Sequence, residues 1–264
     1  MLKKLIKYDL KWSLKVVVIY LILSFSFSVI GRLMDFLPDS FFFAITKGIC
    51  KGAGVGMGVT ALVNGVIRSW VRIITNMYKD ESYLTHTLPI ETNKHFYSKI
   101  ISTIIVCCLC IVVSVISIVI CYLNETTIEY LKTTFNILST NLNTSITLLI
   151  IIMTLIIILE ILFITLCGIT GIIYGYSYNN KKISKSFIFG LMFYGISTGI
   201  IFLIVLICSL FSKNLFNLIF NGVETIDYKS LKFILIGCSL LYGLVNLALI
   251  FIGNHKLKKG INID

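Results

Sequence analysis

Few side chains in this sequence stand where they could do chemistry. Glu160 is the only carboxylate in the middle of a long apolar segment, where an ionised group is costly unless it is paired, protonated or facing water. It is either a substrate-path or proton-linked residue, or a neutral acid bonded to a neighbouring helix. Lys47 and Lys51 lie one helical turn apart. They either reach outward to lipid headgroups or line a water-filled path.

Two further patterns match catalytic or metal sites only in part. The stretch Gly195-Ile196-Ser197-Thr198-Gly199 has hydrolase spacing but lies in an apolar run, far in sequence from the three histidines, so we read Gly195 and Gly199 as helix-packing residues. Most of the eight cysteines also lie in apolar runs, and none has zinc-ligand spacing. No phosphate-binding loop and no His-Glu-x-x-His motif occur. The sequence therefore predicts no catalytic residue, metal or cofactor in this chain.

The elements that must carry these residues are membrane helices. Apolar residues make up 57% of the 264 residues and charged residues 13%, about half the share usual in a soluble domain. A helix needs roughly 20 apolar residues to cross a bilayer, and its backbone is then satisfied internally. The charge-free runs predict an all-α protein with one transmembrane domain, residues 1–264. Its six spans are expected at about 14–34, 43–67, 100–122, 147–176, 187–211 and 232–253.

Lysine and arginine indicate the orientation of these spans. Most of the 23 basic residues lie near the termini, in a polar segment at 68–99 and in a turn at 179–185. Six spans place these four regions on one side of the membrane, which the positive-inside rule makes cytoplasmic. The net charge of +11 then faces anionic lipid of the plasma membrane. Because it is spread over separate segments, it does not favour nucleic-acid binding.

Flanking segments and glycines give further expectations. The sequence of residues 1–13 predicts an amphipathic interfacial helix; the alternative is an ordinary basic anchor for the first span. Residues 123–146 are expected to form an external loop, and residues 212–230 an external one that is apolar enough to be re-entrant. Gly48, Gly52 and Gly56 repeat every four residues, a spacing that lets helices pack closely within or between subunits.

The 68–99 segment is the most informative part of the sequence. An apolar stripe from Val66 to Tyr78 predicts an amphipathic helix that leaves the membrane, and Pro89 ends any helix near Leu88. Trp70, Tyr83 and similar side chains make this segment more apolar than an idle loop needs, which favours a docking surface over a solvated loop.

This segment resembles the cytoplasmic loop of ABC-2-type permeases of Gram-positive bacteria. The matching residues are Tyr78-Lys79-Asp80-Glu81-Ser82-Tyr83-Leu84-Thr85-His86-Thr87-Leu88-Pro89-Ile90, followed by Ser98-Lys99. The family usually has Gly at the position of Ser82 and an apolar residue at that of His86. The match covers about 22 residues, and the six-span layout agrees over the whole chain.

The resemblance implies a type V exporter-like fold and a permease that pairs with a second permease subunit and two ATPase subunits, which would hold ATP and Mg. Relatives of peptide-export and immunity systems imply amphipathic, antimicrobial or cytolytic peptides, or other hydrophobic compounds, as cargo. ATPase coupling would fall on residues 76–89, namely Asn76, Met77, Tyr78, Lys79, Asp80, Glu81, Ser82, Tyr83, Leu84, Thr85, His86, Thr87, Leu88 and Pro89.

Two other classes of function compete with an exporter permease. A secondary transporter or channel would use Glu160 and move substrate under an ion gradient without an ATPase. A membrane enzyme, or a sensory or immunity subunit, is the third class, although no clustered nucleophile and base support the enzyme. An ATPase gene beside this one would favour the permease.

Overall fold

The computed structural model describes residues 2–38, 40–79, 81–87, 90–211, 216 and 228–258. All regular elements in these ranges are helices. Six are long and apolar enough to cross a membrane: Leu2–Phe36, Phe41–Tyr78, Thr92–Tyr122, Ile146–Gly175, Lys182–Leu210 and Leu231–Lys258. The prediction of an all-α chain with six such helices is confirmed. Most of the 212–230 segment lies outside the described residues. The chain divides into two compact units, residues 1–129 and residues 130–262.

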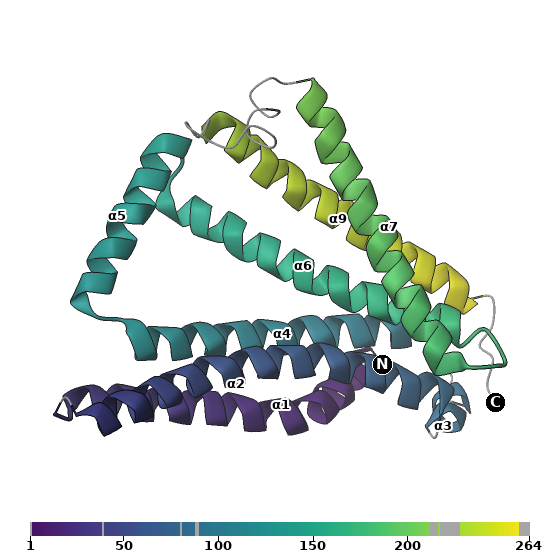
Figure 1. The fold of residues 1–264 in the computed structure, drawn as a ribbon. Helices are drawn as coiled ribbons and strands as arrows, with labels where there is room; N and C mark the ends of the chain where they lie inside the picture. Colours follow the sequence, from purple (N-terminus) through teal and green to yellow (C-terminus); the bar gives the residue numbers. More distant parts are fainter. Residues whose placement is uncertain are drawn as a thin grey trace. The chain divides into compact units, whose positions relative to one another are not determined.

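The first unit is built on three long helices. They are α1 (Leu2–Leu33), α2 (Phe41–Ile73) and α4 (Thr92–Tyr122), which pack against one another pairwise (Figure 1). A 3₁₀ turn, Met34–Phe36, follows α1, and a π-helical turn, Ile74–Tyr78, continues α2. The short helix α3 (Ser82–Thr87) then leads toward α4. The start of α1, the end of α2, α3 and the start of α4 share one end of this unit (Figure 1).

The interfacial helix expected over residues 1–13 is not a separate element. From Leu2 to Leu33 the chain is one uninterrupted α-helix. The first residue that weakens a helix is Gly31, and no proline occurs in this stretch. The amphipathic start therefore continues directly into the first span.

The helices of this unit bury small and polar residues and turn large apolar ones outward. Ser13, Ser24 and Ser28 of α1 are buried, while Ile19, Ile22 and Phe25 are exposed. This is the pattern of helices in lipid, where close backbone packing and interhelical hydrogen bonds replace a water-driven core. The Ser24 hydroxyl illustrates it, since it donates to the backbone carbonyl of Gly54 on α2 (2.7 Å) and lies 3.0 Å from the Ser117 hydroxyl on α4.

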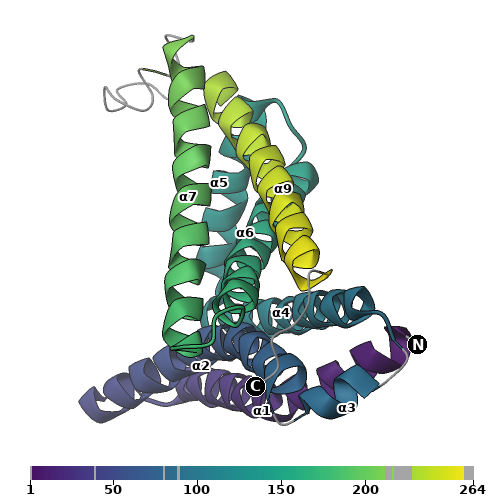
Figure 2. The ribbon, with the colours of Figure 1, turned by 90° about the vertical axis from the view of Figure 1, so that its right-hand side faces the viewer.

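The second unit contains α6 (Ile146–Gly175), α7 (Lys182–Leu210) and α9 (Tyr228–Lys258). Helix α6 packs against both α7 and α9, and Figure 2 shows the three from a second direction. Helices α6 and α7 are in close contact at Gly171, where an added Cβ would lie 2.5 Å from the Cα of Gly190.

The prediction that residues 123–146 form a loop is wrong. Residues 125–142 form helix α5 (Glu125–Leu142). Its start is stabilised locally because the Thr127 hydroxyl accepts from the Asn124 amide (2.7 Å) and Glu125 places an acid in the first turn. The segment contains no glycine or proline that would break it. Polar composition pointed to a loop, but it is equally compatible with an exposed helix.

Candidate functional site

A buried ionic cluster lies at the α3 end of the first unit. We call it the Asp9 cluster: Asp9, Arg72, Glu81, Ser98 and Lys99. The Asp9 carboxylate is 2% exposed. One of its oxygens contacts Lys99 Nζ at 2.5 Å and Arg72 Nε at 3.0 Å, and the other accepts from the Ser98 hydroxyl at 2.6 Å. Helices α1, α2 and α4 are thus joined through one side chain.

The charges of this cluster are balanced. Two cations around one buried carboxylate would leave an excess positive charge in a poorly solvated place. Glu81, just before α3, supplies the second carboxylate, which contacts Arg72 Nη1 at 2.7 Å and accepts from the Asn76 amide at 3.0 Å. The network therefore extends from the three long helices to the base of α3.

An aromatic ring of α1 contacts Arg72 and a second arginine of α2, Arg68. The Arg68 and Arg72 guanidinium carbons lie 4.6 and 5.4 Å from the centre of the Trp12 ring. A guanidinium over an indole face gains about 0.5–2 kcal/mol, depending on its exposure. Trp12 therefore helps to hold the end of α2 against α1.

Local hydrogen bonds hold α3 to this base. The Glu81 amide donates to the Thr75 carbonyl (3.2 Å), and the Ser82 amide donates to the Lys79 carbonyl (2.7 Å). The Thr85 hydroxyl donates to the Glu81 carbonyl (2.9 Å). Ser82 and Thr85 are buried, so the inner side of α3 is fixed.

The outer side of α3 carries exposed side chains, in contrast to the buried inner side. Tyr83 is 73% exposed and Leu84 72%. Lys79 and Thr87 are exposed beside them. We call these four residues the α3 patch. An aromatic ring, an aliphatic side chain and a cation are thereby presented on a fixed support.

The structure sorts the predicted coupling residues 76–89 into two groups. Asn76, Met77, Tyr78, Ser82 and Thr85 are buried, and the Glu81 carboxylate is already paired within the chain. The α3 patch contains the exposed members. Asp80, Leu88, Pro89 and the side chain of His86 lie outside what the structure describes. The segment is therefore not one continuous docking surface, because part of it is buried and Glu81 binds Arg72 of α2.

Lys47 and Lys51 meet a carboxylate at the other end of the first unit. Asp35 contacts Lys47 Nζ at 2.6 Å and Lys51 Nζ at 2.9 Å. Arg32 lies 3.3 Å from Asp35 and also donates to the side-chain oxygen of Asn124. Both lysines are therefore ion-pair partners of Asp35, and these contacts join α1, α2 and the end of α4. Their role in a water-filled path stays a prediction.

The glycines predicted to pack against other helices face open space in the part of the chain that the structure describes. A Cβ added at Gly48, Gly52 or Gly56 would meet nothing within 4 Å. The same holds at Gly195 and Gly199. Helix α2 instead packs through a different stripe of small residues, which includes Gly58. A Cβ added at Gly58 would lie 2.7 Å from the Ser114 hydroxyl of α4. The first stripe remains open, and its packing against a second subunit stays a prediction.

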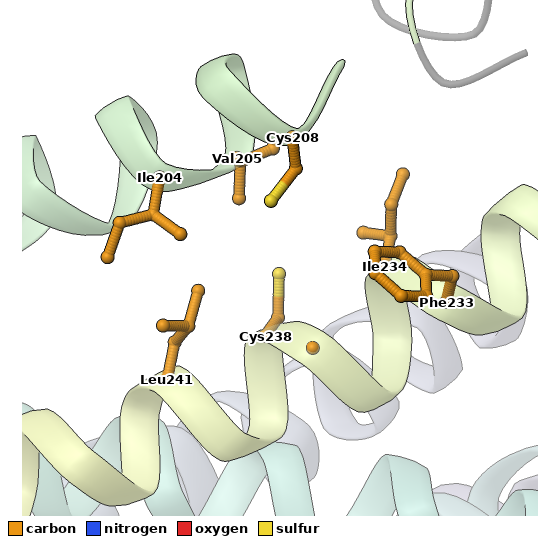
Figure 3. A pocket seen from close by; sticks show the side chains of 8 residues that line it. Ile204, Val205, Cys208, Phe233, Ile234, Cys238 and Leu241 are labelled. Atoms are coloured by element: carbon orange, nitrogen blue, oxygen red, sulfur yellow. The ribbon is translucent and has the colours of Figure 1, made fainter. Parts of the chain in front are cut away.

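The remaining titratable side chains form no metal site. Nowhere in the described ranges do three His, Cys, Asp or Glu residues come together as metal ligands. Cys208 of α7 and Cys238 of α9 point toward each other across a pocket of about 40 Å³ (Figure 3). Its lining is wholly apolar, so these two cysteines lie among apolar side chains.

Sequence reasoning missed Asp9. It is the only acid before Asp35 and stands among five lysines within the first 15 residues. That isolation was a usable signal, because a lone carboxylate on a basic helix needs a reason to be there. Its partners lie 63 to 90 residues away, so local spacing could not name them.

Comparison with known protein families, with curated proteins and with solved structures finds no match for this chain. Its function must therefore be argued from the geometry above.

Proposed function

We propose that this chain is the membrane-spanning permease subunit of an ATP-driven exporter of the ABC-2 type, and that the α3 patch docks an ATPase subunit. The observation that carries this proposal is the exposure of Tyr83 and Leu84 on a short helix that is anchored from beneath. Aromatic residues that can bury in a partner's pocket dominate protein interfaces, and an idle loop gains nothing by presenting them.

The Asp9 cluster supports a mechanism for coupling. Glu81 lies at the base of α3 and binds Arg72 of α2, which binds Asp9 of α1, which in turn binds Lys99 of α4. A displacement of α3 by the partner would therefore be transmitted to all three long helices through these hydrogen-bonded ion pairs. Buried charge pairs are costly to separate, so the helices are expected to follow α3 rather than detach from it.

The proposal assigns nucleotide chemistry to the partner. ATP and Mg would be bound by two ATPase subunits on the cytoplasmic side, where the basic residues place α3 and both termini. The open stripe of Gly48, Gly52 and Gly56 offers a surface for a second permease subunit in the bilayer. Amphipathic peptides or other hydrophobic compounds are the proposed cargo.

The test is ATPase activity of the complex formed with an ABC-type ATPase of the same organism, reconstituted in nanodiscs. Replacing both Tyr83 and Leu84 by Ala is expected to lower the permease-dependent ATPase rate by roughly tenfold or more, the scale of losing an interface hot spot. Tyr130→Ala is the matched control, because Tyr130 of α5 is also 73% exposed and should change the rate little. An unchanged rate in the double variant would contradict docking at α3.

One observation favours a second candidate, a gradient-driven transporter. Glu160 is exposed on α6 and has no ion pair among the described residues. Substrate uptake by the purified chain alone in liposomes, driven by a proton gradient, would favour this candidate over the exporter.

A further inference from the structure

A carboxylate and three aromatic rings come together near the middle of α6. Phe163, one turn after Glu160, is 1% exposed. Its ring centre lies 5.5 Å from that of Tyr194 on α7 and 5.6 Å from that of Tyr242 on α9. Three helices of the second unit thus supply rings to one place, next to the acidic residue.

Among the described residues, the polar atoms around these rings form no ion pair with a basic side chain. The Glu160 carboxylate and the Tyr194 hydroxyl both lie within electrostatic range of the Tyr242 hydroxyl. In the part of the chain that the structure describes, Glu160 makes no ion pair or hydrogen bond, and neither tyrosine hydroxyl is hydrogen-bonded. Negative charge and oxygen atoms therefore gather here without a cation.

A buried amide next to these residues is also incompletely bonded. Asn246 lies one turn beyond Tyr242 on α9 and is 3% exposed. Its side-chain nitrogen donates to the Leu159 carbonyl (3.0 Å), but its side-chain oxygen is buried without a partner. Buried acceptors are normally satisfied, so this second observation also indicates a missing donor, from water or from a ligand.

The chemistry of these groups selects the kind of ligand. An ionised carboxylate in an apolar region is stabilised by a positive charge, and aromatic faces attract cations, quaternary and protonated amines above all. A small metal ion would need several oxygen ligands to replace its water, and one carboxylate cannot supply them. The exposed sides of Glu160 and Tyr194 leave the group open to a ligand that arrives through the lipid.

We propose that Glu160, Tyr194 and Tyr242, with the buried Phe163 ring packed against both tyrosine rings, form a binding site for a lipophilic organic cation. The positive centre would lie against the Glu160 carboxylate, and its apolar arms would lie against the tyrosine rings. The proposal deepens the exporter assignment by making the cargo cationic, and it rests on that assignment only for the claim that the bound molecule is moved.

The test uses the purified full chain in nanodiscs and the monovalent cation tetraphenylphosphonium as probe, with binding measured by calorimetry. Tetraphenylborate, which has the same shape and a negative charge, is the matched ligand control. We expect saturable binding of the cation only. Glu160→Gln should weaken it by roughly tenfold or more, because it removes the negative charge that attracts the phosphonium centre in a weakly screened place. Tyr242→Leu should weaken it by about three- to tenfold.

Glu129→Gln is the matched protein control, because Glu129 is an exposed acid on α5 and its loss should leave binding unchanged. Equal affinity of wild type and Glu160→Gln would overturn the site, as would equal binding of the borate. Tyr242→Leu keeps the test decisive if Glu160→Gln misfolds. Cation binding by a chain that assembles with no ATPase would retain this site while contradicting the exporter proposal.

Discussion

At the scale of single residues, the buried carboxylate of Asp9 is the strongest constraint in the first unit. It satisfies Lys99, Arg72 and Ser98 at once, and among the described residues Lys99 and Ser98 would otherwise be buried donors without a partner. Such groups cost more when one member is lost than they contribute as a set. The cluster therefore serves as a fixed junction rather than as a source of large net stability.

Asp9→Asn is predicted to destabilise the chain by about 3–5 kcal/mol, because it leaves Lys99 buried without a counter-charge while Arg72 retains Glu81. The free energy of unfolding in mixed micelles measures this. Adding Lys99→Met removes the unpaired cation and should recover part of the loss, a coupling that a double-mutant cycle detects. Strictly additive effects of the two substitutions would contradict the pairing.

The same residues show what could and could not be predicted at this scale. Lys99 was singled out because it belongs to a short motif, and Glu160 because it interrupts an apolar run. Asp9 and Asn246 were missed because their partners lie 63 to 90 residues away in sequence. Residue spacing reports neighbours on one helix, whereas these contacts depend on which helix faces pack.

At the scale of elements, the six long helices were predictable because lipid requires an apolar run of a certain length. Their packing faces were less so. Gly48, Gly52 and Gly56 were expected at helix contacts, yet within this chain α2 uses Gly54 and Gly58. Both stripes have the same four-residue spacing, so only the partner helix distinguishes them. Helix α5 was missed because polar composition does not separate a loop from an exposed helix.

Two glycines test the packing directly. Gly171→Ala is predicted to destabilise the chain by about 1–3 kcal/mol, since the new methyl group would meet the Gly190 backbone, which cannot move aside. Gly195→Ala, on α7, places its methyl group in open space and should be neutral or slightly stabilising. Thermal unfolding in detergent compares them, and equal melting temperatures would contradict the close α6–α7 contact.

At the scale of the whole molecule, function divides between the two units as we propose it. The first unit carries the Asp9 cluster and the α3 patch, and the second carries the Glu160 site. The sequence predicted a six-helix membrane protein and pointed to residues 76–89. It could not predict that Asn76–Tyr78 turn inward while Tyr83 and Leu84 turn outward, because that depends on the charges beneath α3.

The central claim, that the α3 patch contacts an ATPase subunit, is tested most directly by photo-crosslinking. Benzoylphenylalanine is placed at Tyr83, and separately at the equally exposed Tyr130, in the chain co-expressed with the partner ATPase. We predict that light produces a covalent adduct with the ATPase from position 83 and none from position 130. An intact complex that gives no adduct from position 83, or equal adducts from both positions, would contradict the claim.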